Sequence, residues 1–405
     1  MVVLRSRVPA AVLLTLRLGG LALGLVSSVI LARTLGVNTY GAYATASSVA
    51  MAITVVGAAG QDQLFLRGTL SIRDLQKRLR ATASISGAIV CGLAAVWPGM
   101  SRDTRICALG LTLALAVVQA MAHYLYAPQR QLNFAARGRR EFMMRLVVSG
   151  GPVVGAMGGS LVAVGGASLL CAILYAIQVT VREHSPPEDV PSHAPFRAGV
   201  PFAISGVLFT LQTAMPPLVL SLFASPASVG FLRLGLVVAT AMQMIPMTLN
   251  TDVLRSRLYA GSRTGSSYAV RRSLLAAAGA GLATSVGAYA LGPAVIAWLY
   301  GGNFASAGDV VRVLALGFPF YCVSTWMATI LVVAGRERLA AQRQAISAGL
   351  LAAALFVVLW YEPTALAAAV VVASLEVVGL AVYLVRGWTT VAAAMSGLSR
   401  SANVK

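Results

Sequence analysis

Apolar runs, each about as long as a lipid bilayer is thick, recur along the whole sequence and constrain the fold more than any other feature. A helix needs about 20 apolar residues to cross about 30 Å of hydrocarbon. We predict twelve such helices, at approximately 8–32, 40–60, 80–98, 106–126, 142–163, 166–181, 197–223, 228–250, 273–299, 310–334, 345–360 and 364–385. Backbone inside a bilayer must satisfy its own hydrogen bonds, so the prediction is an all-α polytopic membrane protein.

Composition excludes a soluble fold of this size. Hydrophobic residues make up 58% of the chain and charged residues 11%, whereas soluble domains carry about 25% charged residues. The basic start, Met1 to Arg7, leads into an apolar run that resembles a signal peptide. That run is longer than the signal-peptide core of about 7–15 residues, so we interpret it as a retained first helix.

The basic residues predict the topology. The chain has 31 Lys and Arg against 12 Asp and Glu, a net charge of +19. Twenty-five of the 31 fall in the N-terminus, in every second loop or in the C-terminal tail, and only Arg33, Arg102, Arg105 and Arg312 lie on the opposite side. Cytoplasmic loops carry such an excess, so both termini are expected in the cytoplasm. No basic stripe is interleaved with aromatic residues, which argues against a nucleic-acid partner.

A polar segment near the middle divides the apolar runs into two sets of six. The residues REHSPPEDVPSHAP have the composition of a linker. We therefore predict an N-terminal six-helix bundle over 1–181, a cytoplasmic linker over 182–195, a C-terminal six-helix bundle over 196–386 and a cytoplasmic tail over 387–405.

The two halves contain a matching turn. Residues 31–43 read LARTLGVNTYGAY and residues 220–232 read LSLFASPASVGFL. Each set places a short polar turn before a glycine, Gly41 or Gly230, between two apolar runs. Because six is an even number, both halves enter the membrane from the same side. We predict two parallel pseudo-repeats around a central cleft, which is a transporter architecture.

Three stretches resemble one family, the polysaccharide flippases of the multidrug/oligosaccharidyl-lipid/polysaccharide exporter superfamily. The stretch at 31–43, with GAAGQDQLFLRG at 57–68, is similar to the family's first helical turn and the end of its second helix. Residues 196–232 look like its seventh helix and the following turn. Residues 299–319, LYGGNFASAGDVVRVLALGFP, and 332–340, VVAGRERLA, are similar to two later motifs. These stretches occur in the family's order.

The resemblance implies a V-shaped, two-lobed flippase of the bacterial inner membrane. Its implied substrate is an undecaprenyl-diphosphate-linked oligosaccharide, the repeat unit of an O-antigen or exopolysaccharide. Membrane lipid, a polysaccharide polymerase and glycosyltransferases are the other implied partners. Two transport alternatives stay open: a peptidoglycan-precursor lipid flippase and a cation-coupled multidrug exporter. The exporter is disfavoured because the only charge in the predicted first helix is Arg17.

Charged side chains inside predicted helices are the candidate functional residues. They cost roughly 2.5–3.5 kcal/mol on insertion scales, so they usually have a specific role. Arg17 and Arg233, in different halves, are candidate ligands for the substrate diphosphate, because a guanidinium binds phosphate oxygens in pairs. An internal ion pair and snorkelling to the interface are the respective alternatives.

Three further charged residues complete the candidate set. Arg67 is a substrate-binding candidate on the family pattern, and Asp62 is a coupling candidate; for both residues a cap at the interface is the favoured alternative. Glu376, near the middle of the last helix, could couple transport to protons or act as the counter-ion of Arg17.

No enzymatic site is expected. The sequence has no P-loop and no external loop long enough for a polymerase or ligase site. Three histidines and twelve acids, mostly in the predicted cytoplasmic loops, do not form a convincing catalytic or metal-binding cluster. We therefore predict a transporter without catalytic residues, cofactors or metal.

Overall fold

The computed structural model describes residues 7–57, 61–66, 70–98, 100–130, 134–182, 200–247, 267–333 and 337–400. Throughout these ranges the fold is all-helical, with no strands. Nine of the described helices contain segments long and apolar enough to cross a membrane. The chain divides into two compact units, Met1–Gly230 and Phe231–Lys405, which are described separately.

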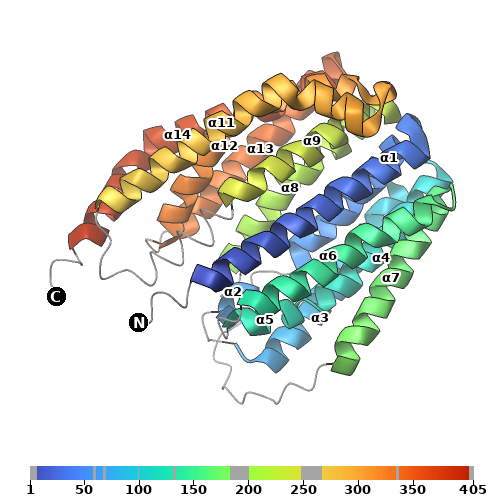
Figure 1. The fold of residues 1–405 in the computed structure, drawn as a ribbon, viewed down its shortest axis with the longest axis horizontal. Coiled ribbons are helices and arrows are strands. Elements are labelled where there is room, and N and C mark those ends of the chain that lie inside the picture. Colours follow the sequence, from blue (N-terminus) through green and yellow to red (C-terminus); the bar gives the residue numbers. More distant parts are fainter. Residues whose placement is uncertain are drawn as a thin grey trace. The chain divides into compact units, whose positions relative to one another are not determined.

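The first unit is built on one long helix, with shorter helices packed beside it. Its elements are α1 (Arg7–Gly57), α2 (Gln61–Leu66), α3 (Ile72–Val96), α4 (Arg102–Ala120), α5 (His123–Arg130), α6 (Phe134–Ala156), α7 (Leu161–Arg182), α8 (Val200–Phe223) and the start of α9 (Pro226–Met247). In Figure 1, α6 lies between α1 and α7, and α8 lies along the other side of α1.

The first predicted span and most of the second lie within α1, which consists of two helical segments joined at a sharp kink. Gly36 has φ 73° and ψ 170°, so the helix is kinked at the predicted turn. A residue with a side chain rarely adopts this positive φ, which explains why glycine occupies the kink.

Glycines allow α4, α6 and α7 to approach backbone to backbone. A Cβ added at Gly110 of α4 would lie 2.6 Å from the backbone of Gly165 in α7. One added at Gly151 of α6 would lie 2.7 Å from Ser168 Cα, and one at Gly155 would collide with the backbone at Val164. Such small residues are how membrane helices gain close contact. Gly151 and Gly155, four residues apart on α6, therefore serve its packing against α7.

The structure corrects the boundary between α6 and α7. We predicted a break at Gly165-Gly166, but both residues lie inside α7. The turn instead follows Ala156, where Gly159 has φ 68° and the Ser160 hydroxyl accepts a hydrogen bond from the Ala163 N–H at 3.1 Å. A left-handed glycine followed by an N-capping serine is a helix stop and start signal. The glycine pair was the wrong signal, because Gly165 serves helix packing against α4.

The two matched turns meet within the first unit. A Cβ added at Gly230 would lie 3.3 Å from Gly41 Cα, and one at Gly41 would collide with the carbonyl of Pro226. The two turns that match in the sequence are therefore in direct contact, while the repeat of six helices remains a prediction.

The second unit contains the remainder of α9 and four further helices: α11 (Ser267–Tyr300), α12 (Ser306–Val333), α13 (Glu337–Tyr361) and α14 (Ala365–Arg400). Its α12 packs extensively against both α11 and α14. Trp326 of α12 is fully buried, and its indole N–H donates to the Ser273 hydroxyl of α11 at 2.9 Å. Residues 183–199 lie outside the described ranges, so the linker remains a prediction.

Candidate functional site

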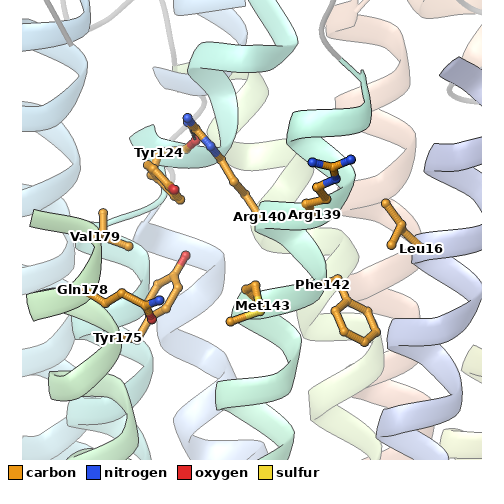
Figure 2. A pocket seen from close by; sticks show the side chains of 9 residues that line it. All are labelled: Leu16, Tyr124, Arg139, Arg140, Phe142, Met143, Tyr175, Gln178 and Val179. Carbon is orange, nitrogen blue, oxygen red and sulfur yellow. Dashed lines mark hydrogen bonds between the residues drawn. The ribbon is translucent and has the colours of Figure 1, made fainter. Parts of the chain in front are cut away.

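A pocket of about 360 Å³ opens among the helices of the first unit. Four elements contribute to it: α1, α5, α6 and α7. The lining residues are Leu16, Tyr124, Arg139, Arg140, Phe142, Met143, Tyr175, Gln178 and Val179 (Figure 2). Its volume lies in the range of small-molecule sites, about 300–1,000 Å³.

One face of α6 supplies four of these side chains in a definite order. At about 100° per residue, Phe142 projects about 60° to one side of Arg139, while Met143 and Arg140 project about 40° and 100° to the other. The Phe142 ring rests on α1, because a Cβ added at Gly19 would lie 3.4 Å from it. Arg140 points instead toward α5. The order Phe142, Arg139, Met143, Arg140 therefore runs from α1 toward α5 and α7 (Figure 2).

Arg140 is held by Tyr124 through two interactions. Its guanidinium donates a hydrogen bond to the backbone carbonyl of Tyr124 at 2.7 Å and lies 3.8 Å from the centre of the Tyr124 ring. A cation over an aromatic face is attracted by the ring's quadrupole. The result is a fixed pair in which α6 is tied to the start of α5.

The break between α4 and α5 places Tyr124 at the pocket. Helix α4 ends at Ala120 and α5 begins at His123, which is buried at 1% exposure. The His123 ring is hydrogen-bonded through Nε2 to the Gln76 amide of α3 at 3.1 Å and through Nδ1 to the Ala120 carbonyl at 3.2 Å. These contacts fix the break, and with it the tyrosine that follows.

The opposite wall comes from α7. Tyr175, Gln178 and Val179 are spaced i, i+3 and i+4, so they share one face of the helix. Tyr175 and Val179 are buried in a cluster with Val118 and Tyr124. Gln178 is partly exposed and brings an amide that can both donate and accept hydrogen bonds.

The pocket is cationic. Among the described residues, two arginines line it and no carboxylate does. Glu141, which follows Arg140 in the sequence, forms an i,i+4 ion pair with Arg145 at 3.0 Å. Because that carboxylate does not line the pocket, the site favours an anion, and its apolar walls favour an amphiphile.

Two charged side chains of the second unit, on α13 and α14, lie at helix contacts. Arg343 of α13 is 6% exposed, and its guanidinium lies 4.7 Å from the centre of the Tyr383 ring in α14. Glu376, two turns before Tyr383 on α14, is partly buried and lies within electrostatic range of Tyr321, Cys322 and Tyr383.

The predicted site residues are placed as follows. Arg17 lies on α1, directly after the pocket residue Leu16, and Asp62 lies on α2, but the side chains of both are outside the described part of the structure. Arg67 lies outside the described ranges altogether. Arg233 is a partly buried residue of α9 in the second unit. Their roles therefore remain predictions.

Sequence reasoning missed Arg139 and Arg140 as pocket residues. We assigned them to a cytoplasmic loop because a charge-rich stretch interrupts the apolar run. The structure starts α6 at Phe134, so both arginines lie in its second turn. The available signal was the spacing of Arg139 to Phe142 and Met143, at i+3 and i+4, which places cations and large apolar groups on one helical face.

Comparison with known proteins yields the fold but no close relative. No family's sequence profile and no curated protein matches the chain. Solved structures do match across nearly its whole length. The lipid II flippase MurJ, in an inward closed conformation, aligns with a TM-score of 0.67 at 16% identity, covering 97% of this chain and 90% of that one.

Two further neighbours are transporters of related architecture. A mutant of the Vibrio cholerae MATE transporter VcmN aligns with a TM-score of 0.59 at 12% identity, covering 98% of each chain. A MOP-superfamily transporter from Pyrococcus furiosus, described as having a binding pocket of reverse polarity, aligns with a TM-score of 0.54 at 13% identity. The alignment covers 98% of this chain and 96% of that one. The chain therefore has the fold of the MOP-superfamily transporters and flippases, a class of multi-pass membrane proteins. At these identities the likeness establishes the fold alone.

Proposed function

We propose that this protein is a flippase that carries an undecaprenyl-diphosphate-linked oligosaccharide, an O-antigen or exopolysaccharide repeat unit, across the bacterial inner membrane. The observation that carries the proposal is the polarity of the pocket in the first unit, whose described lining has two arginines and no carboxylate. A diphosphate headgroup attached to a long hydrocarbon matches such a site. The fold, the net charge of +19 and the sequence resemblance support the same substrate class.

Translocation proceeds by alternating access of two six-helix halves. In this proposal Arg17, Arg233 and Arg67 bind the diphosphate during passage, and Asp62 and Glu376 couple the cycle to an ion or proton gradient. Both termini lie in the cytoplasm, which puts the Arg139 end of the pocket on the side where the substrate is loaded.

A second candidate is transport of a peptidoglycan-precursor lipid. The specific observation in its favour is the likeness to a lipid II flippase. Both substrates are diphosphate lipids, so they share the demand for cations and differ in the saccharide. Export of cationic drugs is disfavoured, because such a substrate would face two arginines in the described pocket.

The test is a transport assay in proteoliposomes with three labelled substrates. These are a polyprenyl-diphosphate oligosaccharide, lipid II and a cationic dye. We expect transport of the first at a rate above that of protein-free vesicles, with the dye excluded. Faster transport of lipid II would select the second candidate. Transport of the dye alone, by folded protein, would refute both flippase proposals.

A further inference from the structure

The pocket of the first unit presents three chemistries in sequence along its length. We propose, on the basis of the flippase function above, that it is a tripartite headgroup site. Leu16 and Phe142 contact the first isoprenoid units, Arg139 binds the diphosphate, and Gln178 with Tyr124 and Tyr175 binds the first sugar. This site would lie within the first unit and be distinct from any formed by Arg17, Arg233 and Arg67.

The order of the three parts follows from the position of α6. This helix packs against α1 on one side and against α5 and α7 on the other. Phe142 and Leu16 form the apolar end beside α1, and Tyr124, Tyr175 and Gln178 form the polar aromatic end beside α7 (Figure 2). Arg139 lies between these ends. A polyprenyl-diphosphate saccharide has the same order of apolar chain, phosphates and sugar.

The two arginines have different roles. Arg140 already donates to the Tyr124 carbonyl and stacks on its ring. Its geometry is therefore set before a ligand arrives, and it acts as a positioning residue for Tyr124. Arg139 is exposed at the pocket, and among the described residues no hydrogen bond or ion pair is assigned to it. A guanidinium in this state can turn its paired N–H groups toward phosphate oxygens.

The polar end has the groups needed to recognise a sugar. Gln178 presents an amide with donors and an acceptor, which can pair with adjacent hydroxyls. Figure 2 shows the hydroxyl end of Tyr175 directed toward Tyr124. Tyrosine rings offer an apolar face together with a polar tip, a combination suited to a sugar ring. At about 360 Å³ the pocket accommodates a headgroup and leaves the remainder of the hydrocarbon chain outside.

The experiment measures binding to the full-length protein in neutral-lipid nanodiscs. The radiolabelled probes are a polyprenyl diphosphate, the same lipid carrying one sugar, and the corresponding polyprenol. Arg139→Ala should weaken the binding of both diphosphate lipids by about tenfold or more, because a charge-assisted contact is lost, and should leave the binding of the polyprenol unchanged. Gln178→Leu should weaken the binding of the glycosylated lipid alone, by about two- to tenfold, the effect expected when one neutral hydrogen bond is lost.

Two variants control these measurements. Arg102→Ala removes an exposed arginine at the start of α4, outside the pocket, and should bind all probes like wild type. Arg139→Lys keeps the charge but loses the paired donors, so binding should recover in part. Thermal melting of each variant would verify folding, and the exposed position of Arg139 predicts no large change.

Defined outcomes would overturn the inference. If Arg139→Ala bound the diphosphate lipids with wild-type affinity, the assignment of Arg139 to the diphosphate would be wrong. If Gln178→Leu lost equal affinity for both diphosphate lipids, the assignment of Gln178 to the sugar would be wrong. Equal competition by phosphatidylglycerol would identify a general phospholipid site, and competition by inorganic diphosphate alone would identify a free-anion site. Transport is measured separately: the predicted binding pattern in a protein that transports neither lipid would refute the flippase but keep the site.

Discussion

Arginines of the two units offer a contrast between an open and an enclosed environment. In the first, Arg139 and Arg140 line a pocket whose remaining walls are apolar, aromatic or amide groups. In the second, Arg343 is 6% exposed and covered by the Tyr383 ring. An arginine at a pocket can bind a ligand, whereas an enclosed one is already held by its own fold. We therefore expect Arg139 to be available to an anionic ligand, whereas Arg343 serves helix packing.

The largest predicted effect concerns the close contact between α6 and α7 near the turn that joins them. Gly155→Leu would force a branched side chain into the backbone of α7 at Val164, where no rotamer avoids collision. We expect a loss of more than about 3 kcal/mol, because overpacking against backbone cannot relax. The measurement is the melting temperature of detergent-purified protein, followed by size-exclusion chromatography.

The same helix provides a matched control. Gly150 lies five residues away on α6, with no atom within 4 Å of an added Cβ. Gly150→Leu should therefore melt near wild type. Similar melting of both variants would mean that the backbone contact between α6 and α7 does not support the pocket.

The second prediction tests whether Arg343 is held by Tyr383. A double-mutant cycle of Arg343→Met and Tyr383→Leu should give a coupling of about 1–2 kcal/mol, the range for a desolvated cation over an aromatic ring. Thermal melts of wild type, both single variants and the double variant measure it. Additive effects would show that the ring does not hold the guanidinium, and the contrast between the units would weaken.

The smallest predicted effect concerns Arg140. Arg140→Gln removes the hydrogen bond to the Tyr124 carbonyl and the contact with its ring. Because the site is partly exposed, we expect a loss of stability of about 1 kcal/mol. Binding of a non-glycosylated diphosphate lipid should fall less than in Arg139→Ala. An equal or greater fall would make Arg140 a direct phosphate ligand and not a positioning residue.

Much of the fold could be predicted because length and hydropathy determine membrane helices. The expected all-helical architecture is confirmed, and the predicted spans at 273–299 and 345–360 fall within α11 and α13. The turn predicted between the first two spans is also found, as the kink at Gly36. An error arose where glycine has a second use: Gly165 reads as a breaker but packs on Cys107, where an added Cβ would lie 2.9 Å from the cysteine Cα.

The candidate site was harder to predict, for a physical reason. A hydropathy average assigns the arginine-rich stretch before residue 142 to a loop, because it ignores which face of a helix each side chain would occupy. Residues Tyr124 and Gln178 are 54 positions apart in sequence and meet only after α5 and α7 have packed around α6. Contacts of that kind depend on tertiary structure, and neither a motif nor a period in the sequence reports them.

The central claim, that the first unit binds the anionic headgroup during transport, is tested most directly by one paired measurement. Flipping of a polyprenyl-diphosphate oligosaccharide would be followed in proteoliposomes containing Arg139→Met or Arg343→Met, with both variants shown to be folded. The account predicts that Arg139→Met lowers the transport rate by about tenfold or more, as loss of a charge-assisted contact implies, while Arg343→Met retains most of it. Full transport by Arg139→Met, with loss in Arg343→Met, would contradict it.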